Sequence, residues 1–443
     1  MPIADVTQGL VDYINASPTP YHCVQETARQ LDVAGFTALD EDARWSLDAS
    51  TNYYVHREGT ILAFRTGTEV PSEAGFRIIG AHTDSPNLRI KPRADIARNG
   101  YQQLGVETYG GVLAYTWLDR DLGLAGRVMV RDDASPTKVS ARYIDIRKPV
   151  LRIPSLAIHL NRTIRTDGFK LNAQKHLVPV LGMASLSGDE GPEGTLARLL
   201  GEHLDVASDA VLTWDLMLAD TLPATVGGWD DSFVFAPRLD NQGSCHAALA
   251  ALLASIDIQA DVAATRMICL YDHEECGSKS AVGAEGPMVE WTLRRIARMD
   301  ASDSNADEAF ARSMARSLQI SADMAHAIHP NYADKHEPQH QPVLNAGPVI
   351  KLNTNQRYAT TGEGAAIFES LCQDAGVPCQ SFVTRSDLAC GTTLGPISSA
   401  RLGIRTIDVG NPMWSMHSIR EQAGSHDHPH MVAAMAGFFG LAS

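Results

Sequence analysis

The fold is decided by the stretch Met267-Ile268-Cys269-Leu270-Tyr271-Asp272-His273-Glu274-Glu275-Cys276-Gly277-Ser278, in which an apolar run leads directly into two carboxylates. The run has the length of a buried strand. In α/β proteins, chemistry is usually placed at the carboxyl ends of strands. Adjacent side chains leave the backbone in different directions, so Glu274 and Glu275 could perform two tasks, one holding a metal and the other handling a proton. The alternative for the isolated pair is a solvated acidic loop.

The composition fits a globular protein of two or three domains, because 443 residues exceed what a single ordinary core organises. Apolar residues make up 44% of the chain and charged residues 20%. The formal charge of −15 provides no basic field for nucleic acid or an anionic membrane, so we expect neither as a partner. An acidic ligand would need a local positive charge, such as a metal ion or a buried lysine.

The sequence shows no sign of export. Its start, Met1-Pro2-Ile3-Ala4-Asp5, has neither the basic start nor the apolar core of a signal peptide, and no apolar run approaches the length of a membrane span. The seven cysteines include no Cys-x-x-Cys pair, which suits reduced thiols and argues against structural zinc held by sulfur. We therefore expect a cytoplasmic protein.

The chain divides into regions with two different patterns of predicted secondary structure. Short β-like pieces such as 111–117, 126–130 and 138–146, with one helix at 195–204, are separated by Gly, Asp and Pro. On either side, strands alternate with helices, which predicts an α/β fold with a mixed, mostly parallel sheet flanked by helices. We therefore predict a discontinuous first domain of residues 1-92 and 235-443, interrupted by an inserted β-rich domain of residues 93-234.

Ionisable residues gather at predicted strand ends of the first domain. These residues are His82 with Asp84, Asp240 before a helix, Glu274 with Glu275, Asp323, and His417 after the last strand. Strand ends of one parallel sheet meet at one edge. Imidazoles with carboxylates suit zinc, manganese or cobalt, whereas an all-oxygen calcium site would not need the histidines. Taken singly, each has an ordinary alternative, such as a loop histidine for His82 or a helix cap for Asp240 and Asp323.

Together these residues stand in motifs that resemble the aspartyl aminopeptidase family of dinuclear zinc aminopeptidases. The motifs, in chain order, are Ala81-His82-Thr83-Asp84-Ser85-Pro86, Leu156-Ala157-Ile158-His159-Leu160-Asn161-Arg162, Leu239-Asp240-Asn241, Asp272-His273-Glu274-Glu275, Ser321-Ala322-Asp323-Met324-Ala325-His326-Ala327 with Pro330-Asn331, and Met416-His417-Ser418-Ile419-Arg420-Glu421. The resemblance covers essentially the whole chain. It implies a metallopeptidase catalytic domain and an inserted domain for dimerisation and substrate access.

The resemblance also implies a role for each motif residue. It implies two zinc ions per subunit, replaceable by manganese or cobalt, with Asp240 bridging them, His82 and Asp323 completing one site, and Glu275 and His417 completing the other. Asp84 would accept a hydrogen bond from the His82 imidazole and fix its tautomer. Two cations can polarise a peptide carbonyl and acidify a bridging water. Glu274 would be the general base that takes the water's proton and later delivers it to the leaving amine.

Three further residues are implied in substrate binding. Lys351 lies in a predicted strand and could point to solvent. The resemblance implies instead that Lys351 and Tyr358 contact the acidic side chain of an N-terminal Asp or Glu of the peptide substrate. His159 could be a structural histidine on a strand, or a substrate contact supplied in trans within a homo-oligomer of dimers assembling to a dodecamer.

Other histidines and other functions stay open at this point. We interpret His426, His428 and His430 as a solvated loop, and the cluster His326, His329, His336 and His340 mostly as loop residues, one of which could contact substrate. The alternatives in function are an aminopeptidase of broader specificity, a carboxypeptidase or an N-acyl amino acid deacylase of the same fold. A further alternative is a catalytically silent assembly or cargo protein.

Overall fold

The computed structural model describes residues 3–132, 135–187, 193–258, 262–299 and 305–441, which form two compact units. The first unit comprises Met1–Asp84, Ala224–Met416 and Glu421–Ser443, and the second comprises Ser85–Pro223 and His417–Arg420. The sequence suggested boundaries at 92/93 and 234/235. The observed divisions fall earlier, at 84/85 and 223/224, and the short return at 417–420 also belongs to the second unit.

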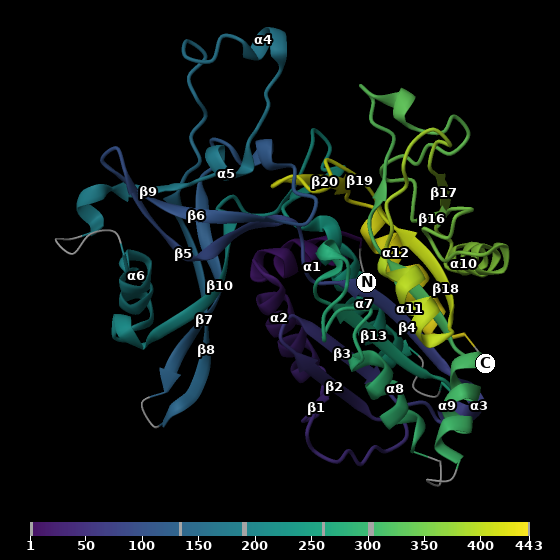
Figure 1. The fold of residues 1–443 in the computed structure, drawn as a ribbon. Coiled ribbons are helices and arrows are strands. Elements are labelled where there is room, and N and C mark those ends of the chain that lie inside the picture. Colours follow the sequence, from purple (N-terminus) through teal and green to yellow (C-terminus); the bar gives the residue numbers. More distant parts are fainter. Residues whose placement is uncertain (1–2, 133–134, 188–192, 259–261, 300–304, 442–443) are drawn as a thin grey trace. The chain divides into compact units, whose positions relative to one another are not determined.

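A nine-stranded sheet forms the centre of the first unit. In spatial order its strands are β1 (Thr37–Ala38), β2 (Asn52–Arg57), β3 (Thr60–Arg65), β13 (Thr265–Tyr271), β4 (Phe76–His82), β14 (Leu318–Ala322), β18 (Arg405–Gly410), β16 (Val349–Leu352) and β17 (Gln380–Val383) (Figure 1). Neighbours run parallel except at β2–β3, β3–β13 and β18–β16. The predicted mixed, mostly parallel sheet is confirmed.

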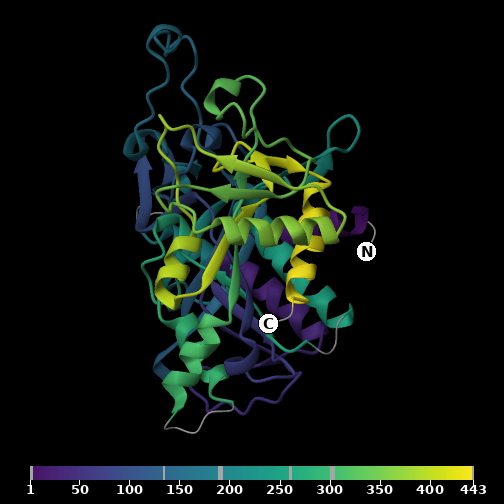
Figure 2. The same cartoon turned by 90° about the vertical axis from the view of Figure 1, so that its right-hand side faces the viewer.

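Helices cover both faces of this sheet, because its central strands are apolar on both sides. All seven residues of β13 are buried; Ile268 and Leu270 join one core, and Met267 and Cys269 join the other. The first face packs against α1 (Ile3–Ala16), α2 (Pro20–Val33), α7 (Leu239–Ile258), α10 (Gly362–Asp374) and α12 (Asp427–Phe439). The second face packs against α8 (Met288–Ala297), α9 (Ala306–Ala315) and α11 (Leu394–Leu402). These layers can be followed in Figure 1 and Figure 2.

A smaller five-stranded sheet completes the first unit, together with the single-turn helix α3 (Pro71–Ala74). Its strands, in spatial order, are β11 (Thr225–Gly227), β12 (Phe233–Ala236), β20 (Glu421–Gly424), β19 (Pro412–Trp414) and β15 (Ala325–His326). Its apolar residues, such as Val234 and Met413, pack with Leu10 and Ile14 of α1. The sheet therefore fixes the segments that follow β14 and β18.

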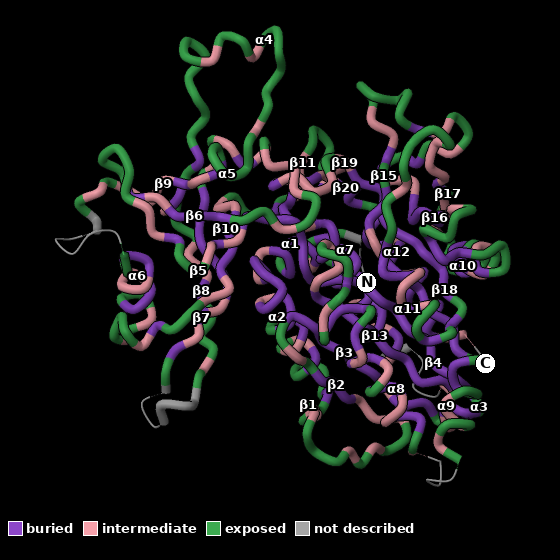
Figure 3. Tube along the Cα trace, viewed as in Figure 1, coloured by how far each residue is buried: buried purple, intermediate pink, exposed green. Residues whose placement is uncertain are grey.

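The second unit is β-rich, as predicted. Its six strands, all antiparallel, lie in the order β8 (Ser135–Leu151), β7 (Leu122–Asp132), β10 (Val211–Asp220), β5 (Asn87–Arg98), β6 (Tyr101–Tyr109) and β9 (Val180–Met183). Three helices accompany them, α4 (Ile164–Asp167), α5 (Ala173–His176) and α6 (Thr195–Leu204). Figure 3 shows that the long loop carrying α4 is exposed along most of its length.

Two local predictions are wrong. Residues 111–117 form a loop ending in the 3₁₀ turn η1 (Ala114–Trp117), because the buried Trp117 joins the core of the second unit without a strand partner. The sequence pattern predicts a closing helix over 431–437, whereas α12 begins at Asp427, with Pro429 in its first turn, where the missing N–H costs nothing. Among the described residues, no helix is long and apolar enough to cross a membrane.

Leu252 tests the core between α7 and the sheet. Its side chain is fully buried in the first core, so Leu252→Ala should reduce the free energy of unfolding by about 2–5 kcal/mol through lost burial and a residual cavity. Val33→Ala is the control, because Val33 is 81% exposed and its truncation should cost about 0.5 kcal/mol or less. Urea denaturation followed by circular dichroism measures both. Equal effects of the two substitutions would contradict this packing.

Candidate functional site

Three parallel strands bring their carboxyl ends to one edge of the large sheet. In the register, Tyr271 of β13 lies opposite His82 of β4, and Ser321 of β14 lies opposite Gly80. The chain segments that leave these strands therefore start side by side. His82 is the last residue of β4, Asp323 directly follows β14, and Glu274 follows β13 after two residues.

A tight turn after β13 carries the two glutamates. His273 adopts a left-handed backbone conformation (φ 68°), and the 3₁₀ turn η4 (Glu274–Cys276) ends at Gly277 (φ 100°). The carboxylate of Asp84 accepts hydrogen bonds from the backbone N–H groups of Glu274 and Glu275, each at 3.1 Å. Asp84 thus anchors the turn that presents both side chains, a contact that the sequence did not suggest.

The imidazole of His82 is oriented by Asp84, which stands two residues after the end of β4. Its Nδ1 lies 3.0 Å from the backbone carbonyl oxygen of Asp84 and 3.4 Å from the Asp84 Oδ1. A carbonyl can only accept, so Nδ1 carries the proton and donates it. The neutral tautomer then leaves Nε2 as a lone-pair donor facing the other side chains of the site.

Carboxylates converge on this nitrogen from three directions. His82 Nε2 lies 3.4 Å from Asp240 Oδ1, 3.6 Å from Asp323 Oδ1 and 3.8 Å from Glu274 Oε2. Ligand atoms of His82, Asp240 and Glu275 all lie within 4.8 Å of one another. The structure thus brings together four of the five predicted metal ligands and the predicted base.

Asp240 is held by a residue that sequence reasoning did not assign. The backbone N–H of Asp240 donates to Glu421 Oε2 at 3.1 Å, and the Asn241 side chain donates to the carbonyl of Ala322 at 2.8 Å. The backbone at Asp240 and Asn241 is not helical, and the peptide bond between them is cis. Glu421 closes the His417 motif, but nothing in its spacing indicated that it would contact the start of α7.

Burial and mutual repulsion raise the pKa values of the glutamates. Burial first, and then Asp323, Asp84 and Asp240, raise the pKa of Glu274 to about 8, although His82 opposes them. Burial, followed by the charge of Asp240, raises the pKa of Glu275 well above its ordinary value. For His82, burial by itself would lower the pKa, but the carboxylates, Glu274 foremost, raise it well above the usual range. A crowd of buried carboxylates around one imidazole is a donor set that fits zinc, manganese or cobalt.

His417 belongs to the second unit. There its Nδ1 lies 3.1 Å from the carbonyl oxygen of Gly111, and its backbone is left-handed (φ 68°). A carbonyl acceptor at Nδ1 leaves the lone pair on Nε2, and metal-binding histidines typically have such a contact at their other nitrogen. Its role as a ligand stays a prediction.

Lys351 lies beside the cluster and not in solvent. Its side chain is 3% exposed, and its Nζ lies 3.5 Å from Asp323 Oδ2. The same ammonium lies 5.5 Å from the centre of the Tyr358 ring, and Tyr358 is itself buried. The solvent-facing alternative for Lys351 is therefore wrong, and the site combines a carboxylate cluster with one buried cation.

The other histidines divide between exposed and structural positions. His159 lies in a turn of the exposed loop of the second unit, so its alternative as a strand residue is wrong. His428 is 2% exposed within α12, and its Nε2 lies 2.7 Å from Nδ1 of the buried His246. The solvated-loop interpretation is therefore wrong for His428, although His426 is exposed. His336 is buried against the backbone carbonyl of His326.

Comparison with known proteins shows the same relatives across nearly the whole chain. The family model described as Aminopeptidase I zinc metalloprotease (M18) matches residues 13–439. "Probable M18 family aminopeptidase 2" of Pseudomonas aeruginosa (strain UCBPP-PA14) is 49% identical over 440 residues, 98% of each chain, and its namesake in Ectopseudomonas mendocina is 49% identical over 436 residues, again 98% of each.

Solved structures agree with this assignment. The chain resembles the subunit in "Cryo-EM structure of the Ape4 and Nbr1 complex" with a TM-score of 0.94 and 40% identity, covering 99% of this chain and 86% of that one. It resembles "Structure of S. cerevesiae mApe1 dodecamer" with a TM-score of 0.85 and 30% identity, covering 98% and 96%. The chain therefore belongs to the M18 family of aminopeptidases, which are zinc metalloproteases, as its motifs predicted.

Proposed function

We propose that this metallo-aminopeptidase removes N-terminal Asp or Glu from peptides. The observation that carries the acidic preference is the buried ammonium of Lys351, 3.5 Å from Asp323 at the edge of the carboxylate cluster. In a chain with a formal charge of −15, a substrate carboxylate needs such a local cation. A charge pair in a small buried pocket interacts far more strongly than charges across water.

The residues that would hold two zinc ions in this proposal are His82, Asp240, Asp323, Glu275 and His417. The short distances among the donor atoms of His82, Asp240, Asp323 and Glu275 support this assignment. When bound, the ions supply Lewis-acid polarisation of the scissile carbonyl and acidify the attacking water.

Glu274 acts as the proton carrier in this proposal. Its Oε atoms take a proton from the attacking water and then deliver it to the leaving amine nitrogen, so that the peptide C–N bond can break. Two observations support the role. The Glu274 Oε2 lies 3.8 Å from His82 Nε2 beside the other carboxylates, and Asp84 holds the backbone N–H of Glu274 in place.

We further propose that the second unit forms dimers that assemble to a dodecamer in the cytoplasm. One structural relative is described as a dodecamer. The loop around His159 exposes Leu156, Ile158 and Leu160 at 59%, 45% and 75%, an apolar group that suits contact with a second copy. All seven cysteines, each within the described residues, carry free thiols, which supports a reducing compartment.

A substrate panel tests the proposed function directly. Hydrolysis of aspartyl, glutamyl, leucyl and N-acylated substrates is measured side by side, with zinc, manganese or cobalt added. The proposal expects metal-dependent hydrolysis with the highest kcat/KM on acidic N-termini. Preference for leucyl substrates would indicate an aminopeptidase of broader specificity. Hydrolysis of N-acylated substrates would indicate a deacylase. Absence of any hydrolysis would indicate a catalytically silent assembly protein.

Glu274→Gln tests the proton carrier. Because the amide cannot accept the water's proton, turnover should fall by about 10²-fold or more while both metal ions are retained. Activity assays and metal analysis by mass spectrometry measure the two quantities. Glu285→Gln is the control, since Glu285 is an exposed glutamate of the following loop. Unchanged turnover in Glu274→Gln would reject the assignment.

Lys351→Met tests the acidic pocket. Removing the ammonium while keeping the apolar stem should lower the ratio of kcat/KM for aspartyl over leucyl substrates by about tenfold or more, the worth of one charge-assisted hydrogen bond. The ratio isolates selectivity from any general effect on the site. Lys335→Met is the control, because Lys335 is a largely exposed lysine paired with Asp334. An unaltered ratio in Lys351→Met would refute the pocket.

His159→Ala tests the contribution of the exposed loop. Activity should fall while metal content stays normal, and His203→Ala, an exposed histidine of α6, should leave activity unchanged. If His159 acts on a neighbouring subunit, mixing His159→Ala with Glu274→Gln subunits should restore part of the activity, since some sites then hold both intact residues. Lack of complementation in mixed oligomers would count against action in trans.

A further inference from the structure

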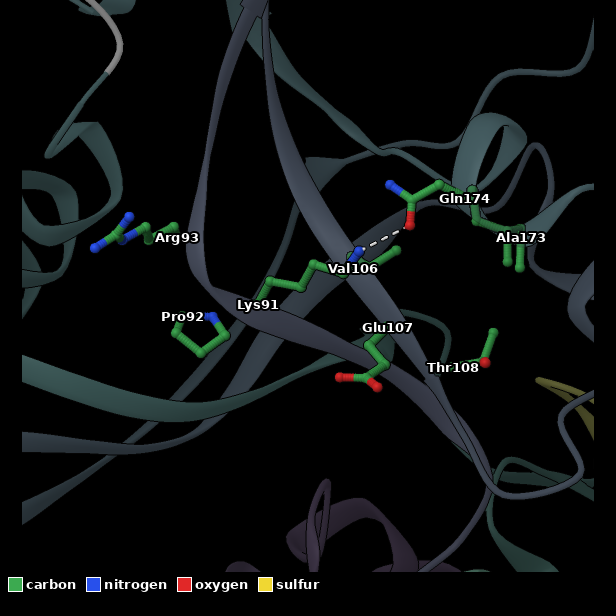
Figure 4. Close-up of a pocket in the computed structure, with 9 residues that line it drawn as sticks. Lys91, Pro92, Arg93, Val106, Glu107, Thr108, Ala173 and Gln174 are labelled. Atoms are coloured by element: carbon green, nitrogen blue, oxygen red, sulfur yellow. Dashed lines mark hydrogen bonds between the residues drawn. The ribbon is translucent and has the colours of Figure 1, made fainter.

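Two cavities that share no lining residue with the carboxylate cluster contain cations. The cavity of the second unit, about 660 Å³ between β5, β6 and α5, is shown in Figure 4. There Lys91 Nζ donates to Gln174 Oε1 at 3.1 Å, and the Glu107 carboxylate shares the lining. Arg93 also lines that cavity, but no aromatic side chain stands among its described lining residues, whereas the second cavity combines cations with tryptophans.

The second cavity, about 410 Å³ in the first unit, lies between α8 and the segment before β2. Four arginines and two tryptophans line it, Arg57, Arg294, Arg295, Arg298, Trp45 and Trp291. Trp291 and Arg295 stand four residues apart on one side of α8, and Arg298 directly follows the last residue of the helix. The volume falls within the range of small-molecule pockets.

Two of the four arginines are neutralised by carboxylates. Arg57 and Glu41 form a two-point ion pair, with Nε donating to Oε2 at 2.8 Å. Arg294 donates to Glu290 Oε1 at 2.9 Å and to Asp307 Oδ1 at 3.1 Å. These pairs fix the walls of the cavity and add no net charge to it.

The other two arginines leave a positive charge without a carboxylate. Arg295 donates to the backbone carbonyls of Glu41, at 2.8 Å, and Ala43, and its guanidinium stacks on Trp45 with 3.6 Å to the ring centre. Arg298 is exposed. Within the described parts of the chain, no carboxylate lies at ion-pair distance from either residue. Among the described residues, the one carboxylate that lines the cavity is that of Glu41. It is paired with Arg57 and also acts on Arg295, so the described lining keeps a net positive charge in a chain of formal charge −15.

Trp291 adds an unoccupied aromatic face. Its side chain is 53% exposed, whereas the indole of Trp45 is already covered by Arg295 and donates its Nε1–H to Asp40 at 2.8 Å. Cations in the last turn of a helix stabilise its dipole, which accounts for Arg294 and Arg295. The helix dipole does not account for the exposed indole of Trp291 or for the exposed guanidinium of Arg298.

We propose that this cavity binds a nucleoside monophosphate. The phosphate carries close to two negative charges at neutral pH, which match the charges of Arg295 and Arg298. The fork of Arg298 can donate two parallel hydrogen bonds to phosphate oxygens. The base stacks on Trp291, since every base offers a π-face to an indole. The site lies apart from the peptidase residues and is independent of the substrate that they cleave.

Titration calorimetry with adenosine monophosphate tests the proposal on the metal-loaded, assembled enzyme. We expect one nucleotide per chain, and weaker or no binding of adenosine or inorganic phosphate, each of which offers half of the contacts. Arg298→Ala and Trp291→Ala should each weaken binding by about tenfold. Arg312→Ala removes the same charge from an exposed arginine paired with Glu73 and should leave binding unchanged.

Several outcomes would overturn the proposal. Absence of nucleotide binding, or equal binding by wild type and Arg298→Ala, would exclude the cavity. Binding that disappears when a chelator removes the active-site metal would place the nucleotide on the metal instead. If acrylamide quenches the fluorescence of wild type and Trp291→Phe to the same extent, Trp291 is covered by another copy of the chain, and the cavity is closed to ligands.

Discussion

Electrostatic crowding at one sheet edge is the constraint on which the first unit depends. Four carboxylates lie 3.4–3.8 Å from the ring nitrogens of His82; those of Asp84 and Asp240 are buried, and those of Glu274 and Asp323 are partly buried. Buried like charges at such distances repel strongly and shift pKa values toward the neutral forms. Divalent cations would relieve this repulsion, which is why we propose this donor set as the site of the metal.

Hydrogen bonds to backbone N–H groups hold the segments that carry these carboxylates in place. Asp84 accepts two amide N–H groups of the turn after β13, and Glu421 accepts the N–H of Asp240. The ammonium of Lys351 lies 3.5 Å from Asp323 Oδ2 and offsets the negative charge of that carboxylate. Each contact joins segments far apart in the chain, so the large sheet, with its fixed parallel register, is what brings them within reach of one another.

The predictable part of this architecture came from local signals. Apolar runs marked β13 and β14, and the ionisable residues that follow them could be placed at one edge because parallel strands share a direction. The contacts of Glu421 and the buried state of Lys351 could not be predicted, since they depend on which segments pack together. The alternating histidines near 428 resembled a polar loop, but the pairing of His428 with His246 makes that position part of a core.

Anomalous diffraction at the zinc absorption edge, from crystals of the zinc-loaded enzyme, tests the central claim most directly. The account predicts two zinc peaks per subunit with Asp240 between them, His82 and Asp323 on one, Glu275 and His417 on the other, and Glu274 outside both coordination spheres. A single peak, or a zinc ion coordinated by Glu274, would contradict it.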